Sequence, residues 1–348
     1  MKVIISHRPL HSGSKTRGVG VYTRELIEAF HKYFPEDKLI PSSRDYYHDD
    51  ADLIHFPFFD PFFVTLPSKF KKPTIVTIHD LTPLKFPEHF PIGVRGKIKF
   101  FIQKMRVRRA AHILTDSEAS KADIVSLLGI PQNRITVVQL AHNTEKVPTV
   151  MARRIANKYK LPSKYLLYVG DINWNKNVIG LIKAFNNLNI PDLHLVLVGK
   201  VFGDKPNIPE WKEIETVISN SNKKDFIHLI GYAPTHHLPV FYGNATLYVQ
   251  PSWYEGFGLP LLEAMTYGCP IASSNRGSLP EVGGDAVAYF DPDKNMVEVI
   301  FDLLSNTRRR NSLVQKGLER VKLFSWAKTA AETRVIYKQV IAGQNENS

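Results

Sequence analysis

Two glutamates stand eight residues apart in the stretch Y-E-G-F-G-L-P-L-L-E-A-M, at Glu255 and Glu263. The apolar run at 246–250 before them reads as a strand, so the predicted order is strand, glycine turn, helix. Pro260 suits the first turn of that helix, where its missing N–H costs nothing. Glu255 then projects from the turn, and Glu263 lies on the helix one or two turns further on.

The start of this predicted helix has the chemistry of an anion site. Unpaired backbone amides at a helix N-terminus bind phosphate, and glycines let the backbone approach it closely. Glu263 would reach a ribose diol, and Glu255 a polar group carried by the diphosphate. The stretch therefore predicts a site for a nucleotide sugar, with backbone contacts from Gly256, Phe257, Gly258 and Leu259.

Two further strand ends carry reactive side chains. Lys176 follows the predicted strand 165–169 in the run N-W-N-K-N, where an ammonium group can neutralise a leaving diphosphate. His79 ends the predicted strand 74–77, and the adjacent Asp80 could orient its ring. We therefore expect Glu255, His79 and Lys176 to be the catalytic residues.

The glutamate stretch resembles the E-x7-E signature of the retaining glycosyltransferases of family 4, and the resemblance spans nearly the whole chain. It implies a GT-B α/β fold, in which two Rossmann-like domains face a cleft and a C-terminal helix returns to the N-terminal domain. It also implies that His79 contacts the donor sugar and that the amide of Gly18 meets the donor diphosphate. Where the family has an Arg before the Lys, this chain has Asn175, which puts donor affinity in doubt.

The pattern is most similar to mannosyltransferases of polysaccharide assembly, so GDP-mannose is the favoured donor and UDP-sugars come second. The donor is a substrate, and no resident cofactor is expected. No metal is expected either, because D-P-D at 291–293 follows a strand and contains proline, which favours a turn. Expected acceptor-side residues are His7, Arg17 and His55, with a glycan or lipid-linked saccharide as acceptor.

Length and alternation predict the architecture. A chain of 348 residues is long for one hydrophobic core. Short β-branched runs alternate with helical stretches, which favours parallel sheets. We expect domains over 1–146 and 147–324 and a returning helix over 325–348. The expected strands are 2–6, 52–55, 74–77, 112–115 and 135–138, then 165–169, 194–198, 227–229, 247–250, 271–273 and 288–290.

The net charge of +12 is concentrated in one segment. Between Gly93 and Thr115 there are seven Lys or Arg residues, no acidic residue, and interleaved Ile, Phe and Met. This pattern is typical of a basic amphipathic helix that binds an anionic membrane, here through Arg95–Arg109. A helix with its apolar side on the sheet and its charges in water remains equally open.

Location and rival functions follow from the same features. Met1 leads directly into an apolar strand, and the single cysteine fits a reducing compartment, so we expect a cytoplasmic protein. If the basic helix binds a membrane, we expect the protein to be peripheral at the inner face of the plasma membrane. A nucleotide-sugar epimerase or hydrolase of the same fold is the main alternative to a transferase. A sugar-nucleotide sensor without catalysis stays open because of Asn175. Nucleic-acid binding is not expected, because no recognition module accompanies the basic residues.

Overall fold

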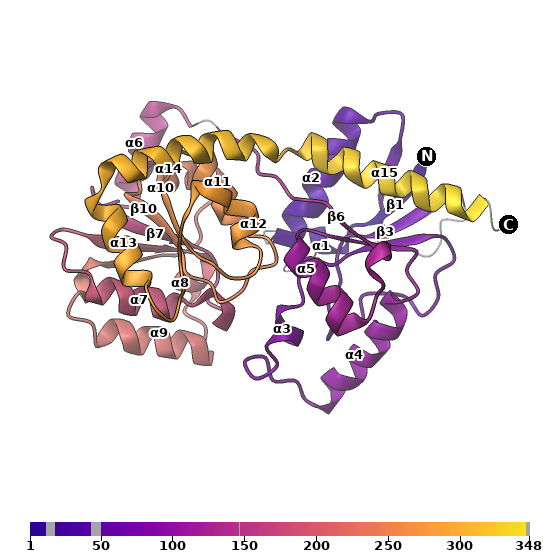
Figure 1. Ribbon diagram of the computed structural model, residues 1–348, viewed down its shortest axis with the longest axis horizontal. Coiled ribbons are helices and arrows are strands. Elements are labelled where there is room, and N and C mark those ends of the chain that lie inside the picture. Colours follow the sequence, from indigo (N-terminus) through magenta and orange to yellow (C-terminus); the bar gives the residue numbers. More distant parts are fainter. Residues whose placement is uncertain (12–17, 43–49, 146, 346–348) are drawn as a thin grey trace. The chain divides into compact units, whose positions relative to one another are not determined.

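The computed structural model describes residues 1–11, 18–42, 50–145 and 147–345. The chain folds into two compact units, each built on a parallel six-stranded sheet (Figure 1). The first unit comprises 1–141 and 324–348, and the second comprises 142–323. The α/β architecture that was expected from the alternation of β-branched runs with helical stretches is confirmed.

The first unit has the strand order β2-β1-β3-β4-β5-β6. Helices α2 and α15 cover one face of its sheet, and α3, α4 and α5 lie on the other (Figure 1). The strands are β1 (Lys2–Ser6), β2 (Lys38–Ser42), β3 (Leu53–Phe56), β4 (Thr74–Thr77), β5 (His112–Thr115) and β6 (Ile135–Val137). The helices are α1 (Arg8–His11), α2 (Gly18–Tyr33), α3 (Thr82–Lys85), α4 (Val94–Val107), α5 (Glu118–Asp123) and α15 (Trp326–Asn345).

Strand β2 was not expected from the sequence. Its residues K-L-I-P-S contain Pro41, which cannot donate a ladder hydrogen bond and therefore argues against a central strand. The structure resolves the conflict by placing β2 at the sheet edge, where it pairs with β1 alone. Helix α5 begins with a local cap, because Ser117 Oγ accepts a hydrogen bond from Ser120 N at 3.0 Å.

The second unit has the order β12-β11-β10-β7-β8-β9. Helices α7 and α9 cover one face of its sheet, and α10 and α11 the other (Figure 1). The strands are β7 (Tyr165–Val169), β8 (His194–Val198), β9 (Ile227–Ile230), β10 (Leu247–Gln250), β11 (Ile271–Ser274) and β12 (Ala288–Phe290). The helices are α6 (Thr149–Lys158), α7 (Val178–Asn187), α8 (Lys200–Asp204), α9 (Pro209–Ser219), α10 (Leu238–Asn244), α11 (Leu259–Thr266), α12 (Leu279–Gly283), α13 (Met296–Ser305) and α14 (Thr307–Arg320).

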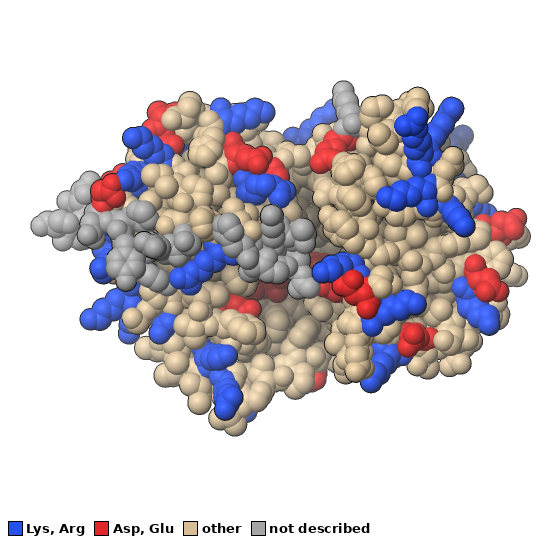
Figure 2. Space-filling view, turned by 180° about the vertical axis from the view of Figure 1, so that it is seen from behind, with Lys and Arg blue, Asp and Glu red and all other residues tan. Residues whose placement is uncertain are grey.

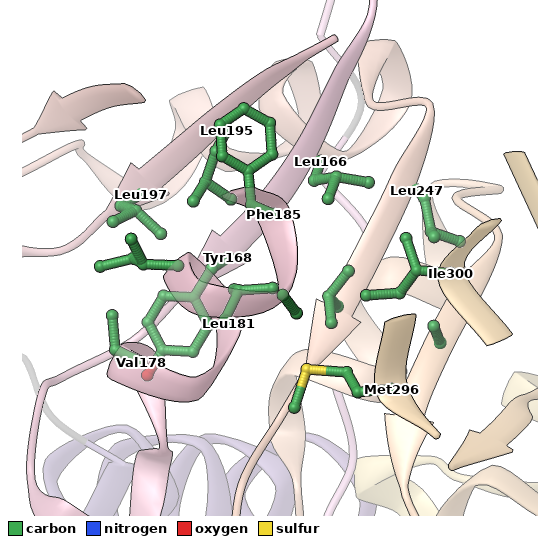
Figure 3. Packing of buried hydrophobic residues seen from close by; sticks show 14 of the residues in the cluster. Leu166, Tyr168, Val178, Leu181, Phe185, Leu195, Leu197, Leu247, Met296 and Ile300 are labelled. Carbon is green, nitrogen blue, oxygen red and sulfur yellow. The ribbon is translucent and has the colours of Figure 1, made fainter. Parts of the chain in front are cut away.

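The core of the second unit lies between its sheet and helices α7 and α13. Figure 3 shows Leu181 and Phe185 of α7 and Ile300 of α13 gathered over Leu166 and Leu195 of the sheet. Each of these side chains is fully buried, and burial of each one stabilises the folded state by about 1.5–3 kcal/mol. This packing fixes the sheet whose strand ends carry the candidate site.

The C-terminal helix α15 belongs to the first unit, where it packs against α2. Tyr337 of α15 is buried, and its hydroxyl lies 2.6 Å from His55 Nδ1. His55 Nε2 lies 2.8 Å from Thr77 Oγ1. Burial lowers the pKa of His55 to about 3, so the ring is neutral, and it links Tyr337 of α15 through Nδ1 to Thr77 of β4 through Nε2.

Replacement of Tyr337 by Phe should therefore lower the free energy of unfolding by about 1–3 kcal/mol, because it leaves a buried ring nitrogen without its partner. The measurement is the urea unfolding midpoint of Tyr337→Phe. Tyr33→Phe is the matched control, since Tyr33 is 43% exposed. Equal midpoints for the two variants would contradict this role of the hydrogen bond.

Candidate functional site

The second unit brings Lys176 and Glu255 together at the point where its strand order reverses. Strands β7 and β10 are neighbours in the sheet, but their following helices lie on opposite faces. The loops after such a pair of strands separate, and open α/β sheets bind ligands in the resulting crevice. Lys176 lies in the short turn after β7, and Glu255 in the loop after β10.

The Glu255 carboxylate is held by three donors. Lys176 Nζ lies 2.8 Å from Oε1 and 2.7 Å from Oε2. Gln250 Nε2 and Ser252 Oγ also donate to Oε1, at 2.9 and 2.7 Å. Glu255 is buried, whereas the Lys176 side chain is 24% exposed, so its neighbours fix the carboxylate while the ammonium group can be reached from solvent.

Asn175 has a role that its place in the sequence did not indicate. Its side chain is buried, and Nδ2 donates to the carbonyl of Tyr254 at 3.0 Å, directly before Glu255. Trp253 N donates back to the Asn175 carbonyl at 2.8 Å. The residue therefore ties the Lys176 turn to the Glu255 loop. Direct contact of its amide with a donor stays a prediction.

Glu263 lies on α11, and its carboxylate has different neighbours. Tyr242 donates its hydroxyl to Oε2 at 2.6 Å, and His142 Nδ1 lies 4.0 Å from Oε1. Burial raises the pKa of Tyr242 well above its usual value, so the hydroxyl keeps its proton and donates. The ring of Tyr242 contacts Tyr248, whose hydroxyl donates to Gln250. One buried chain of tyrosines thus connects the surroundings of the two glutamates.

The helix start expected before Pro260 is confirmed, with α11 beginning at Leu259. Gly258 precedes it with φ of 103°, a left-handed conformation that side chains other than glycine rarely adopt. A Cβ at this position would lie 2.8 Å from Leu279 Cδ2. The glycine therefore allows the loop from Glu255 to enter α11, and contact between the amides of residues 256–259 and a phosphate stays a prediction.

Comparison with known proteins agrees with this geometry. Residues 152–320 match the model of "Glycosyl transferases group 1", and residues 37–146 match "Glycosyltransferase Family 4". O-antigen chain mannosyltransferase B of Escherichia coli is 31% identical over 322 residues, which are 90% of this chain and 80% of that protein.

The chain belongs to the family 4 glycosyltransferases.

Other relatives and solved structures are similar to this glycosyltransferase over different shares of their length. Serotype-specific mannosyltransferase WbdA of E. coli is 30% identical over 78% of this chain and 35% of that protein. Sucrose-phosphate synthase of Thermosynechococcus elongatus shares the fold with a TM-score of 0.76 and 20% identity. The match covers 99% of this chain and 100% of that one. HepE of Anabaena, in complex with UDP and glucose, gives a TM-score of 0.73 and 14% identity. Here the match covers 97% of this chain and 100% of that one. These structural likenesses confirm the GT-B fold.

In the first unit of the glycosyltransferase, His79 pairs with a carboxylate that the sequence reasoning missed. Nδ1 lies 2.6 Å from Asp116 Oδ2, and Nε2 lies 3.1 Å from the carbonyl of Pro57. The expected partner, Asp80, instead accepts from Thr82 N at 2.9 Å, which corrects that interpretation. Asp116 follows β5, the neighbour of β4, so the rule that parallel strand ends meet at one edge could have found it.

The acceptor-side residues have three different outcomes. His55 is fully buried under α15, so its interpretation as an acceptor contact is wrong. Arg17 lies outside the described residues. His7 follows β1 and is partly exposed, and its acceptor role stays a prediction. Gly18 is exposed at the start of α2, and a Cβ there would meet nothing within 4 Å, so its contact with the diphosphate also stays a prediction.

The D-P-D sequence forms a turn, as expected. Asp291 Oδ1 accepts from Asp293 N at 3.1 Å, and both carboxylates pair with Arg276. Within the described ranges, no group of three or more His, Cys, Asp or Glu residues could hold a metal ion. In the same ranges, no helix is long and apolar enough to span a bilayer.

Helix α4 has two apolar faces, which neither sequence interpretation anticipated. Gln103 and Val107 are buried against the unit, but a second stripe faces outwards. Its members are spaced four, three and four residues apart, as one helical face requires, and Ile98 and Phe101 are 56% and 65% exposed. The stripe consists of Val94, Ile98, Phe101 and Met105, and we call it the α4 stripe. Lys and Arg side chains lie among uncharged atoms at this end of the unit (Figure 2).

The ion pair of His79 generates a pH-dependent prediction. Burial opposes protonation of the ring, but the Asp116 carboxylate outweighs it, and the pKa of His79 is raised. The ion pair therefore stabilises the folded protein fully at pH values below about 6.5, the pKa of histidine in the unfolded chain. This stabilisation is lost as the pH rises through the higher pKa that His79 has in the folded protein.

Asp116→Asn should consequently reduce stability more at about pH 6 than at about pH 9. Urea unfolding of the wild type and the variant at both pH values measures the difference. Asp80→Asn is the control and should show a much smaller change with pH. A loss of stability in Asp116→Asn that is independent of pH would exclude a charged His79 in the folded protein.

Proposed function

We propose that this glycosyltransferase is a retaining mannosyltransferase that uses GDP-mannose and acts on a hydroxyl of a glycan or lipid-linked saccharide at the cytoplasmic face of a membrane. The sugar is proposed from the mannosyltransferases among its relatives, including one of similar length. The nucleotide-sugar class is proposed from the chemistry of the site.

The observation that carries the proposal is the contact between the Lys176 ammonium and the Glu255 carboxylate at the strand-order reversal. A nucleotide sugar needs a cation for its diphosphate and an acceptor group for its sugar hydroxyls, and these two side chains supply both. The amides before α11 would add dipoles for the diphosphate. Glu263, held by Tyr242, would accept hydrogen bonds from the ribose hydroxyls.

The proposed reaction breaks the bond between the anomeric carbon and the leaving phosphate oxygen. The acceptor oxygen forms the new bond on the same face, and its proton passes to that phosphate oxygen, so GDP is released and configuration is retained. Lys176 stabilises the growing negative charge on the diphosphate, and Glu255 the positive charge on the sugar. Charge neutralisation by Lys176 and backbone amides means that no metal ion is needed in the proposal.

The membrane part of the proposal is carried by the α4 stripe. Exposed apolar side chains flanked by cations fit the interface of an anionic bilayer, where the apolar groups insert and the cations meet phosphates. From Gly93 to Thr115 the chain has no acidic residue that would repel such a surface.

The donor is tested by thermal shift with GDP-mannose, UDP-glucose and ADP-glucose. GDP-mannose should raise the melting temperature most, because stabilisation grows with ligand occupancy. Glu255→Gln and Lys176→Ala should each lower mannosyl transfer by about tenfold or more. EDTA should leave transfer unchanged. The matched controls are Glu298→Gln and Lys183→Ala, which alter exposed residues of the same unit.

Full activity in both the Lys176 and Glu255 variants would refute the donor site. Stabilisation by UDP-glucose alone would refute the proposed donor while keeping the class. Incubation with the donor but no acceptor should give no product, whereas an epimerase or hydrolase would convert the donor.

Membrane binding is tested by cosedimentation with phosphatidylglycerol and phosphatidylcholine vesicles. The anionic vesicles should bind more tightly, and the double variant Ile98→Ser, Phe101→Ser should weaken binding by about tenfold or more through lost apolar insertion. Phe301→Ser is the control, because Phe301 is 49% exposed but belongs to the other unit. Equal losses in the variant and the control would mean that α4 is not the membrane surface.

A further inference from the structure

A buried glutamine attaches the chain segment 60–66 to helix α4. Gln103 Nε2 donates to the carbonyl of Asp60 at 3.0 Å and to Thr65 Oγ1 at 2.7 Å. Its Oε1 accepts from Leu66 N at 3.4 Å. A fully buried amide with these three partners holds the segment in one position beside the helix.

The tip of this segment is apolar and exposed. Asp60 Oδ1 accepts from Phe62 N and Phe63 N at 2.7 and 3.0 Å, which turns the chain outwards. Phe63 and Val64 are 64% and 47% exposed. Lys99 Nζ of α4 lies 5.2 Å from the ring centre of Phe63. The tip therefore continues the apolar and cationic surface that begins on α4.

Next to the tip, the first unit has a hollow of ≈ 520 Å³, which is within the usual size of a small-molecule site. Buried side chains of β3 and of the segment form its apolar part, together with Val64, Pro67 and Phe70. Among the residues that the structure describes, the polar part of the lining is one serine and three cations, with no acidic residue. These four are Ser68, Lys69, Lys71 and Arg106.

We propose that this hollow binds the apolar chain of one phosphate-bearing lipid molecule, with the phosphate at Lys69 and Lys71. An inorganic anion alone would leave the apolar lining in contact with water, whereas a lipid covers both parts of the hollow. Arg106 already donates Nη1 to the carbonyl of Leu66 at 2.5 Å, so it forms part of the wall and adds its charge.

Continuity with the membrane surface favours a lipid over a soluble metabolite. Val64 lines the hollow and also belongs to the exposed tip beside α4. A lipid could therefore enter from the bilayer without crossing a polar surface. The inference rests on the proposed function in one respect, since a lipid-linked acceptor is a source of such a molecule.

The test uses soluble lauroyl lysophosphatidate below its micelle concentration, with inorganic phosphate as the probe for a plain anion site. Calorimetry on the full chain should show binding of the lysolipid and none of phosphate at the same concentration. The double variant Lys69→Glu, Lys71→Glu should weaken lysolipid binding by about tenfold or more, since both reversed charges would face the phosphate. The matched control, Lys32→Glu with Lys38→Glu, reverses two exposed cations elsewhere in this unit.

A second variant tests the apolar part. Val64→Asp should abolish lysolipid binding, while Ile98→Ser with Phe101→Ser should leave it unchanged, because the α4 stripe does not line the hollow. The melting temperature without lipid is measured for every variant. If the double charge reversal prevents folding, Lys69→Gln replaces it.

Equal lysolipid affinity in the hollow variants and their control would overturn the proposal, and so would phosphate binding as tight as that of the lysolipid. The donor experiment separates this result from the proposed function. Stabilisation by GDP-mannose should be the same in the hollow variants as in the wild type. A wild type that is stabilised by GDP-mannose but binds no lysolipid rejects only the hollow, and a wild type that binds lysolipid but no nucleotide sugar rejects only the proposed function.

Discussion

The contact between Lys176 and Glu255 is the interaction on which the geometry of the candidate site depends. It joins the loops that follow β7 and β10, which are adjacent in the sheet but far apart in sequence. A buried carboxylate with one ammonium partner and two neutral donors is stable only while those partners stay in place. Asn175 contributes by bonding the backbone beside Glu255, so the residue that replaces the expected cation holds the two loops together.

Sheet topology explains why reactive groups gather where they do. In each unit all strands are parallel, so every βα loop emerges at the same edge. His79 and Asp116 meet in the first unit for the same reason that Lys176 and Glu255 meet in the second, since each pair follows neighbouring strands. The edge is therefore polar in both units, and the cores beneath it are apolar.

Local sequence predicted most of the elements, and its failures have physical causes. Strand β2 was missed because Pro41 argues against a strand unless its edge position is known. His55 was assigned to an acceptor because it ends an apolar run, but the returning helix α15 covers it. The second apolar face of α4 was not predicted, because a pattern of apolar and basic residues does not say which apolar residues meet the core.

The sequence alone predicted the family and the two parallel sheets, which are confirmed, and it selected Glu255, Glu263 and Lys176 as candidate site residues, because glycine turns, helix starts and strand periodicity are local properties. Only the tertiary structure decided that Asp116 pairs with His79, that Gln250, Ser252 and Tyr242 hold the two glutamates, and that the stretch 64–71 lines a hollow together with β3 and α4. These contacts join residues of separate strands and helices. Their partners are selected by sheet order and packing, which no single stretch of sequence contains.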